Sequence, residues 1–301
     1  MTINEHITEF AGLPVVDFVP DMEPPADPSG VAWRITEDHD LSEMIPEQVE
    51  HLPTVVDPAD VRALIICAWD APLSVEQLVG LASRLTGLRA VFLGEMTFEE
   101  CEISWIEQED ITPLLAAYPD LEVLRVRGTN GLALAPVRHA ALRELAFESG
   151  GLPASVVRAV AACDLPALTH LELWLGTDEY GGDTTVDDLA PILAGTRLPA
   201  VRYLGLRDAE IADEVAATLA TAPVVAQLDT VDLSLGILSD KGVAALLAGQ
   251  PLTHLRRLDL HHHYVNRELA DRLTAELAGV EVDLSDHQAA DNDRRYVAVS
   301  E

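Results

Sequence analysis

Three consecutive histidines follow an aspartate in the segment DLHHH at residues 259–263, the densest group of potential metal ligands and proton carriers in the chain. Imidazole and carboxylate groups bind zinc and transfer protons. If the leucines beside Asp259 point into a core, Asp259 and His261 share the other face of a strand, and His263 lies in the turn after it. A complete site would need ligands from neighbouring strands, such as Asp232 or Asp283. The simpler interpretation is that these residues end a strand and bond nearby backbone. A metal-binding module or metal-dependent enzyme built on Asp259, His261 and His263 is therefore the alternative function.

Two acidic segments could also bind ligands. Segment 175–188 carries Asp178, Glu179, Asp183, Asp187 and Asp188, whose oxygens could gather calcium, but their spacing differs from that of an EF-hand loop. Thr184 with Asp187 is instead typical of a capping box at a helix start. Segment 94–110 surrounds Trp105 with acidic residues. It is either a docking loop for a basic ligand or a loop held by packing of Trp105.

Known catalytic and phosphate-binding motifs are missing from the sequence, which contains no GxxxxGK[ST], GxSxG, HExxH or GxGxxG. We therefore expect a protein that is not an enzyme, with no catalytic residues, no cofactor and no bound metal.

The charge balance restricts the class of partner. Asp and Glu number 51 against 19 Lys and Arg, which gives a formal net charge of −32. Such a chain repels phosphate backbones and anionic membrane surfaces, so we expect neither a nucleic acid nor a membrane as partner. The three cysteines are far apart, and no apolar stretch is long enough to be a signal peptide or membrane span. These features predict a cytoplasmic protein with reduced thiols.

A repeat of the form L-x-x-L-x-L organises most of the chain. Copies begin at Val61, Leu88, Leu121, Leu142, Leu168, Val201, Leu228 and Leu255, and a degenerate copy begins at Val280. The steps between the first eight are 27, 33, 21, 26, 33, 27 and 27 residues. Most of these steps lie within the period of about 20–29 residues expected of leucine-rich repeats, and the two longest imply insertions.

Each repeat predicts a short strand followed by a helix. Apolar residues two apart point to one side of a strand, and segments 74–85, 185–194, 211–220 and 266–277 have helical periodicity. Ser74 with Gln77 resembles a capping box. Such units stack with parallel strands and stabilise one another. The expected fold is α/β: a leucine-rich-repeat solenoid, or horseshoe, with parallel strands on the concave face and helices on the convex face.

Three regions follow from where the repeat starts and stops. Residues 1–57 do not fit the repeat, and the segments 11–18 and 31–35 are predicted to be strands. An N-terminal cap is expected for this region, and an independent small domain is the alternative. Residues 58–285 form the solenoid. Residues 286–301 form a C-terminal tail, for which disorder is the default and docking of an extended segment at an open sheet edge is the alternative.

Residues three, five and seven of each repeat should project from the concave face. They include aromatic and arginine side chains, the types enriched at binding hot spots, among acidic neighbours. Ion pairs within the chain would explain the arginines equally well. The predicted partner-binding residues are Trp174, Tyr203, Arg207, Glu172, His170, Arg125, Arg127, Asp232, Asp259 and His261.

These repeats resemble the leucine-rich-repeat superfamily, and the helix-containing ribonuclease-inhibitor-like subtype most closely, over residues 61–285. The segments ECEISWI (100–106), LELWLGTDEYGGD (171–183) and QPLTHLRRLDLHHH (250–263) also resemble a family of uncharacterised bacterial leucine-rich-repeat proteins. That resemblance implies an accessory role beside radical-SAM and ATP-grasp enzymes and carries over no catalytic residue. The predicted function is a non-catalytic scaffold that binds a protein or peptide on its concave face, as an accessory to a biosynthetic or modifying enzyme.

Overall fold

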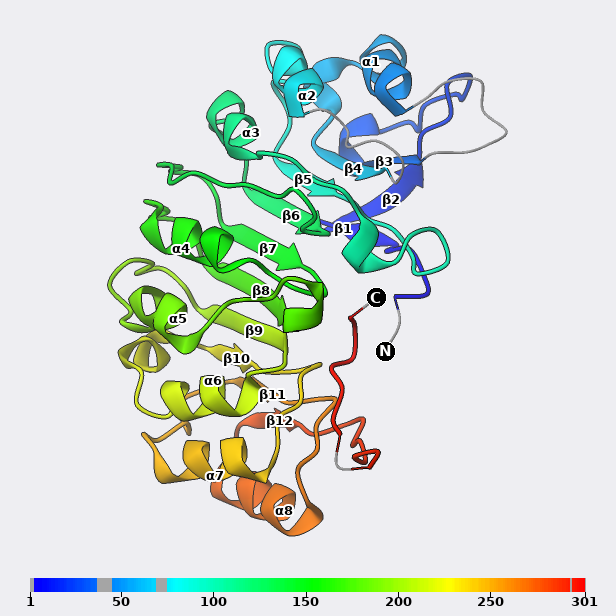
Figure 1. Ribbon diagram of the computed structural model, residues 1–301. Helices are drawn as coiled ribbons and strands as arrows, with labels where there is room; N and C mark the ends of the chain where they lie inside the picture. The colour runs from blue at the N-terminus through cyan, green and yellow to red at the C-terminus, as the bar shows by residue number, and fades with distance from the viewer. Residues whose placement is uncertain (1–2, 37–44, 69–74, 293, 301) are drawn as a thin grey trace.

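The structure, a computed structural model, describes residues 3–36, 45–68, 75–292 and 294–300. Twelve strands form one sheet in sequence order: β1 (Glu9–Phe10), β2 (Leu13–Asp17), β3 (Ala32–Thr36), β4 (Ala63–Cys67), β5 (Ala90–Leu93), β6 (Val123–Arg127), β7 (Glu144–Glu148), β8 (His170–Gly176), β9 (Tyr203–Ala209), β10 (Thr230–Asp232), β11 (Arg257–Asp259) and β12 (Glu281–Asp283). The pairing from β2 onwards is parallel, and only β1 pairs antiparallel to its neighbour. The chain is therefore a solenoid (Figure 1), as the repeat predicted.

The helices lie on the outer side of the arc. They are α1 (Ile45–Val55), α2 (Val75–Leu81), α3 (Thr112–Ala117), α4 (Ala154–Ala162), α5 (Val186–Leu193), α6 (Ala212–Leu219), α7 (Asp240–Ala248) and α8 (Arg267–Glu276). Each helix from α2 to α7 follows a strand and lies against the same face of the sheet (Figure 1). Strands on the inside and helices on the outside confirm the predicted α/β horseshoe.

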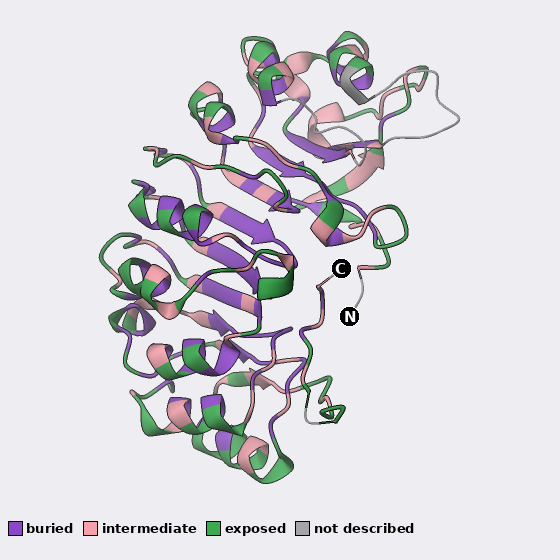
Figure 2. Ribbon diagram, in the orientation of Figure 1, coloured by how far each residue is buried: buried purple, intermediate pink, exposed green. Residues whose placement is uncertain are grey.

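The middle leucine of the repeat sets the register. Leu64, Val91, Leu124, Leu145, Leu171 and Leu204 are aligned on successive strands and lie fully buried under the helices. Because side chains alternate along a strand, the residues on either side of each leucine face the concave surface. Figure 2 shows the result: the strands are largely buried, whereas the helices are buried on one side only.

Helix α5 begins one residue later than the capping motif predicted. Thr185 is the N-cap, and its capping box is completed by Asp188. The predicted pair of Thr184 and Asp187 is wrong, because Thr184 is buried and its hydroxyl donates to the carbonyl of Leu152 in the preceding repeat. The capping box predicted at Ser74 lies outside the described residues.

Residues before the first leucine-rich copy extend the same sheet. The two strands expected in segments 11–18 and 31–35 are present as β2 and β3, and Ala32 is aligned with Ala63 of β4. A hairpin of β1 and β2 ends the sheet. We propose that this hairpin caps the solenoid at its N-terminal end.

The C-terminal tail is ordered where the structure describes it, so default disorder is wrong for residues 294–300. Val297 and Val299 are buried. The backbone N–H of Ala298 donates to the carbonyl of Leu235, and that of Val299 donates to Asp208. In its described residues the tail does not add a strand beside β12. It crosses the carboxyl ends of the strands (Figure 1), and Val299 and Ile3 pack in one cluster.

Candidate partner-binding face

A cavity of about 810 Å³ opens on the concave face between the hairpin β1–β2 and the strands β4 to β8. Its floor is made of the small or apolar side chains Ala63, Ala90, Phe92 and Val123. They occupy the concave positions of β4, β5 and β6, where alanine leaves room that larger side chains would fill. Phe10 of the hairpin packs on Phe92, with ring centroids 5.8 Å apart. This combination of an apolar floor and a polar rim is typical of ligand sites.

Arginines surround this cavity in an otherwise acidic chain. Five of the chain's 19 Lys and Arg line it: Arg62, Arg89, Arg125, Arg127 and Arg143. Arg62, Arg89 and Arg143 occupy the second position of their repeats, immediately before β4, β5 and β7. The backbone carbonyl of each of the three accepts a hydrogen bond from the next strand segment, and all three residues line the cavity.

The two arginines of β6, Arg125 and Arg127, form ion pairs with neighbouring glutamates. Arg125 Nε lies 2.6 Å from Glu144 and its Nη1 lies 3.1 Å from Glu148. Arg127 Nε lies 2.8 Å from Glu148, and its Nη1 donates to the carbonyl of Met96. By contrast, Arg62 is exposed, and no ion pair involves it among the described residues. The positive charge available to a ligand therefore lies at the rim.

Glu172 is the centre of the charge network farther along the face. Its side chain is 4% exposed and contacts Arg207 at 2.5 Å and Arg125 at 3.6 Å. It also accepts hydrogen bonds from Trp174 Nε1 at 2.7 Å and His170 Nε2 at 3.3 Å. Burial alone would raise the pKa of Glu172, but the hydrogen bond from His170 and the charges of Arg207 and Arg125 outweigh it and lower that pKa. Glu172 is therefore a buried carboxylate anion.

Stacked rings continue the network. His170 and Tyr203 are parallel, with ring centroids 3.8 Å apart. The hydroxyl of Tyr203 donates to Asp232 over 2.6 Å, and Asp232 also lies 3.3 Å from Arg207 Nε. Arg207 in turn lies over the ring of Trp174. The ion pairing within the chain that the sequence left open is thus realised.

The exposed position predicted for Trp174 is wrong. Its side chain is 7% exposed and packs with Ile103, Leu235 and Val299. The covering residue Val299 belongs to the tail, which follows 125 positions later in the sequence. Arg127, Glu172, Asp232 and Asp259 are likewise buried, whereas Arg125, His170, Tyr203, Arg207 and His261 are half-buried. The network therefore holds the concave face in shape and offers a partner only part of its polar surface.

The predicted cluster of Asp259, His261 and His263 does not form. His261 Nδ1 lies 2.7 Å from Asp259, but His263 is buried and its two ring nitrogens contact the backbone of Leu284 and Val265. Burial lowers the pKa of His263. Asp283, predicted as a supplementary ligand, does meet the first two residues: donor atoms of Asp259, His261 and Asp283 lie within 4.8 Å of one another. Arg257, however, bridges Asp259 and Asp283 at 2.8 and 3.0 Å. The guanidinium group of Arg257 therefore binds the carboxylates of Asp259 and Asp283, where the alternative function would require a metal ion.

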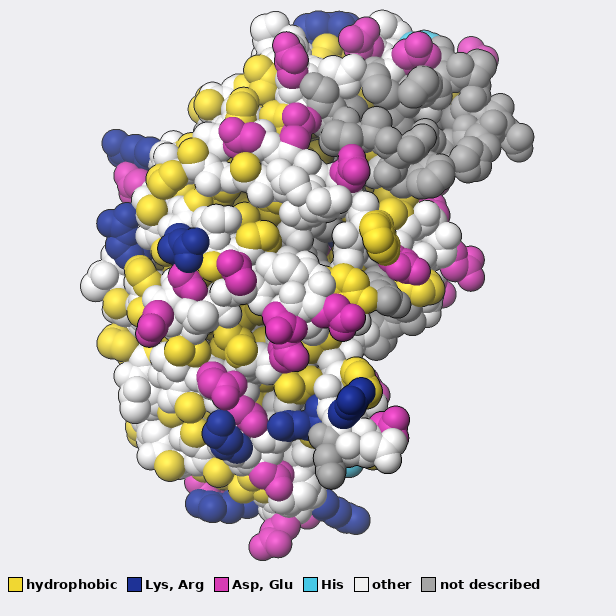
Figure 3. Space-filling view, in the orientation of Figure 1, with side chains coloured by type: hydrophobic (Ala, Val, Ile, Leu, Met, Phe, Trp, Pro, Cys, Tyr) yellow, Lys and Arg dark blue, Asp and Glu magenta, His cyan; other side chains and the backbone are white. Residues whose placement is uncertain are grey.

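The acidic segment 94–110 is only partly a solvated loop. Glu95 is fully buried, and the backbone around Ile103 and Ile106 is held by burial of those side chains. Of the two alternatives for this segment, a loop held by packing of Trp105 is wrong: Trp105 is 65% exposed, and its Nε1 donates to Glu102. On the face drawn in Figure 3, acidic side chains lie singly or in small groups between hydrophobic and arginine side chains.

Some residues of the concave face were predicted from the sequence, and others were not. The predicted residues from Arg125 to His261 do share one face. Arg62, Arg89 and Arg143 were missed, although arginine recurs at the second position of the repeats, also as Arg202 and Arg256. That recurrence was a usable signal, because a fixed position in a solenoid has a fixed place in space.

Comparisons with known proteins agree with the fold. The chain is similar to a protein of Bacteroides fragilis of known crystal structure, with 31% identity and a TM-score of 0.75 over 80% of this chain and 69% of that one. Two other solved structures align more loosely. An internalin (inlF) of Listeria monocytogenes has 14% identity and a TM-score of 0.43 over 86% and 69% of the chains. TLR13, in a complex with ssRNA13, has 13% identity and a TM-score of 0.42 over 92% and 38%. No protein-family model and no curated protein matches the chain. Among the described residues, no helix is both long and apolar enough to cross a bilayer.

Proposed function

Because the chain belongs to the leucine-rich-repeat proteins, in one family with the Bacteroides fragilis protein, we propose that it is a non-catalytic scaffold that binds a protein or peptide on its concave face. The accessory role beside a bacterial biosynthetic or modifying enzyme belongs to the same proposal. We also propose that nucleic acid is not a partner, because the net charge of −32 repels a phosphate backbone.

The observation that carries this proposal is the cavity behind the hairpin β1–β2. Its volume of about 810 Å³ lies within the range of roughly 300–1,000 Å³ typical of ligand sites, and its apolar floor would bury apolar side chains of a peptide. The hairpin, through Ile7, Glu9 and Phe10, supplies one wall. The floor is preformed, because Phe92 and Ala90 are fixed by strand pairing on both sides. A preformed site lowers the entropic cost of binding.

The rim defines which peptides fit. Arg62 and Arg89 stand beside the apolar floor, and Arg89 lies 3.7 Å from the exposed Asp120. Of the cavity's glutamates, Glu122, Glu144 and Glu148 pair with arginines, whereas Glu9 of the hairpin is exposed. The expected ligand is a peptide segment with apolar side chains next to an acidic group. Charge complementarity at a rim acts mainly on specificity and on the rate of association.

Selection of displayed random peptides on the purified full chain tests this proposal. We expect enrichment of sequences that combine apolar and acidic residues, and a fluorescein-labelled synthetic copy should bind by anisotropy. Arg62→Glu should weaken its binding about 10-fold, which equals about 1.4 kcal/mol. Arg267→Glu changes the net charge equally, but its side chain is 95% exposed on the convex helix α8, so this control should bind as the unmodified chain does. Equal binding by the two variants, or no enrichment at all, would contradict the proposal.

A further inference from the structure

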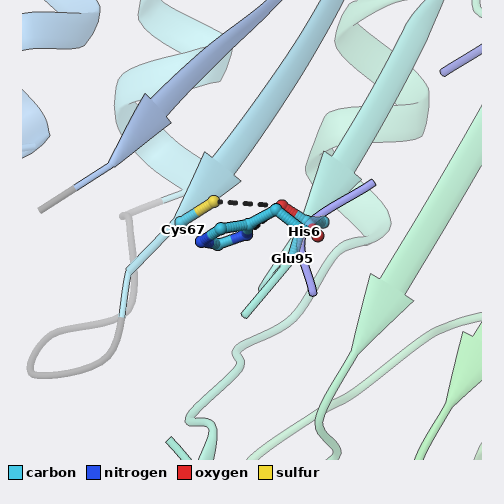
Figure 4. A group of neighbouring side chains, drawn as sticks. All are labelled: His6, Cys67 and Glu95. Atoms are coloured by element: carbon cyan, nitrogen blue, oxygen red, sulfur yellow. Dashed lines mark hydrogen bonds and ion pairs between the residues drawn. The ribbon is translucent and has the colours of Figure 1, made fainter. Parts of the chain in front are cut away.

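Three residues far apart in the sequence meet at one end of the sheet, next to the N-terminal segment. Glu95 Oε2 lies 2.8 Å from His6 Nδ1 and 3.6 Å from Cys67 Sγ. The three donor atoms all lie within 4.8 Å of one another (Figure 4). Cys67 and Glu95 are buried, and His6 is partly exposed. Solvent can therefore reach the group from the side of His6.

The fold explains why these side chains converge. Cys67 is the last residue of β4, and Glu95 follows β5 after a turn at Gly94, whose φ of 79° suits glycine. The neighbouring strands are parallel and in register, so both side chains emerge at the same edge. The N-terminal segment is fixed there because the N–H of Ile7 donates to Glu95 Oε1.

The donor set is the one that zinc prefers. Thiolate, imidazole and carboxylate are its three protein ligand types, at about 2.3, 2.0 and 2.0 Å from the ion. Donors at these distances in a tetrahedron are separated by roughly 3.3–3.5 Å. The observed 3.6 Å between Cys67 and Glu95 is close to that range, and the 2.8 Å between His6 and Glu95 requires an opening of about 0.5 Å.

The histidine is oriented from its other side. His6 Nε2 lies 3.0 Å from Glu100, whose carboxylate accepts from both the N–H and the hydroxyl of Thr97. A carboxylate on the second ring nitrogen is the usual outer partner of a metal-bound histidine. In the tautomer protonated at Nε2, the lone pair of Nδ1 is directed at the space shared with Cys67 and Glu95.

The surrounding charges suit a divalent cation. Arg34 Nη1 lies 3.6 Å from Glu95, but its Nε is paired with Asp17 at 2.6 Å. Without an ion, a Cys67 thiolate, Asp17, Glu95, Glu100 and Arg34 carry a formal charge of −3, which one divalent ion reduces to −1. Burial and the adjacent Glu95 raise the pKa of the Cys67 thiol, so metal binding must release its proton: the S–H bond breaks, the S–metal bond forms and the proton goes to solvent.

We propose that His6, Cys67 and Glu95 bind one zinc-class cation, with water in a fourth position, and that this ion fastens the N-terminal segment to the ends of β4 and β5. The segment continues into Ile7, Glu9 and Phe10, which form a wall of the concave cavity. The ion would thus fix that wall without touching the ligand. This site was not predicted, and no bound metal was expected, because its donors stand 61 and 28 positions apart in the sequence and form no spaced motif.

Titration of Co²⁺ into chelator-treated full chain tests the site. We expect a near-ultraviolet thiolate-to-cobalt band and visible bands of tetrahedral intensity, both removed by an equivalent of Zn²⁺, together with a rise in melting temperature on zinc binding. Cys67→Ser should abolish the thiolate band. Cys163→Ser, which alters another buried thiol, should leave it intact. Glu100→Gln should keep the band and weaken cobalt affinity about 10–100-fold.

Two results would overturn the proposal. One is the absence of a thiolate band in the unmodified chain, and the other is its persistence in Cys67→Ser. If Cys67→Ser fails to fold by circular dichroism, His6→Ala replaces it, because His6 lies in the partly exposed N-terminal segment. Loss of tetrahedral bands in that variant would support the site, and unchanged spectra would refute it. Peptide binding is measured separately, so failure of this site leaves the proposed concave-face function to its own test.

Discussion

Replacement of Glu172 by glutamine removes one negative charge from the middle of the concave network and changes almost nothing in shape. The side chain is 4% exposed, with Arg207 at 2.5 Å and Arg125 at 3.6 Å. Removing one partner of a buried ion pair costs about 3–5 kcal/mol. Arg125 keeps Glu144 and Arg207 keeps Asp232, which places the expected loss near the lower end, at about 3 kcal/mol.

Urea unfolding followed by far-ultraviolet circular dichroism measures this loss in free energy of unfolding. In a thermal scan, at about 2 °C per kcal/mol for a chain of this size, the melting temperature should fall by about 6 °C. Glu122→Gln is the matched control, because Glu122 and Arg143 form a pair 3.3 Å apart with side chains 45% and 64% exposed. Exposed pairs contribute about 0–1 kcal/mol. A Glu172→Gln chain no less stable than the control would refute the assignment of Glu172 as a buried anion.

The stability difference between the unmodified chain and Glu172→Gln, measured as a function of pH, gives a second test. The pKa of Glu172 is lowered by folding from an ordinary value of 4.5, so its ionised form stabilises the folded state. That contribution is fully present above the unfolded-state pKa and is lost as the pH falls through the folded-state pKa. The stability difference between the unmodified chain and Glu172→Gln should therefore be constant at neutral pH and shrink below about pH 4.5. A constant difference down to pH 3 would contradict the sign of the shift.

Three further predictions concern other parts of the chain. Val299→Asp places a carboxylate against Trp174 and Leu235, so acrylamide should quench Trp174 fluorescence more strongly; Tyr296→Asp, at a ring 56% exposed, should not change it. Gly94→Ala adds a Cβ 2.4 Å from the carbonyl of Arg127 at a φ of 79°, whereas Gly12→Ala, at 74°, meets nothing within 4 Å. Thermal unfolding should therefore show about 1–2 kcal/mol of φ strain for Gly12→Ala and a larger loss for Gly94→Ala, and equal losses would refute the close approach. Asp259→Asn removes the hydrogen bond that raises the pKa of His261, so the NMR titration of His261 should move to lower pH. The stability from that pair is present below the unfolded pKa of 6.5 and is lost as the pH rises through the folded value, and an unmoved titration would show that the bond is unimportant.

The fold was predictable because one physical requirement recurs at each repeat. A short strand must bury its central leucine against the next unit, and this requirement fixed both the register and the concave position of residues such as Arg125 and Glu172. The strands β2 and β3 were also visible as apolar segments. Their membership of the same sheet was less apparent, because VAWRI places Trp33 where other copies have leucine.

The site was harder to predict, because its features depend on contacts between distant segments. Trp174 has the type and position of a binding residue, and only the later tail, through Val299, covers it. His263 shares a motif with Asp259, but the turn after β11 directs it to the backbone of Leu284. Phe10 of the hairpin, 53 positions before the first residue of β4, supplies part of one wall of the cavity. The period of the repeat predicts contacts between neighbouring repeats, but it does not predict contacts made by segments outside the repeat.

The course of the two terminal segments has a mechanical consequence. Residues before β1 and after β12 meet over the carboxyl ends of the middle strands, where Ile3, Ile103, Trp174 and Val299 form one small cluster. A linear stack held at its ends normally peels apart one unit at a time. Force applied through these two terminal segments would first shear the cluster and only then load the outermost repeats. We therefore expect a pulling experiment to show a single early rupture, and we expect Val299→Asp to abolish it.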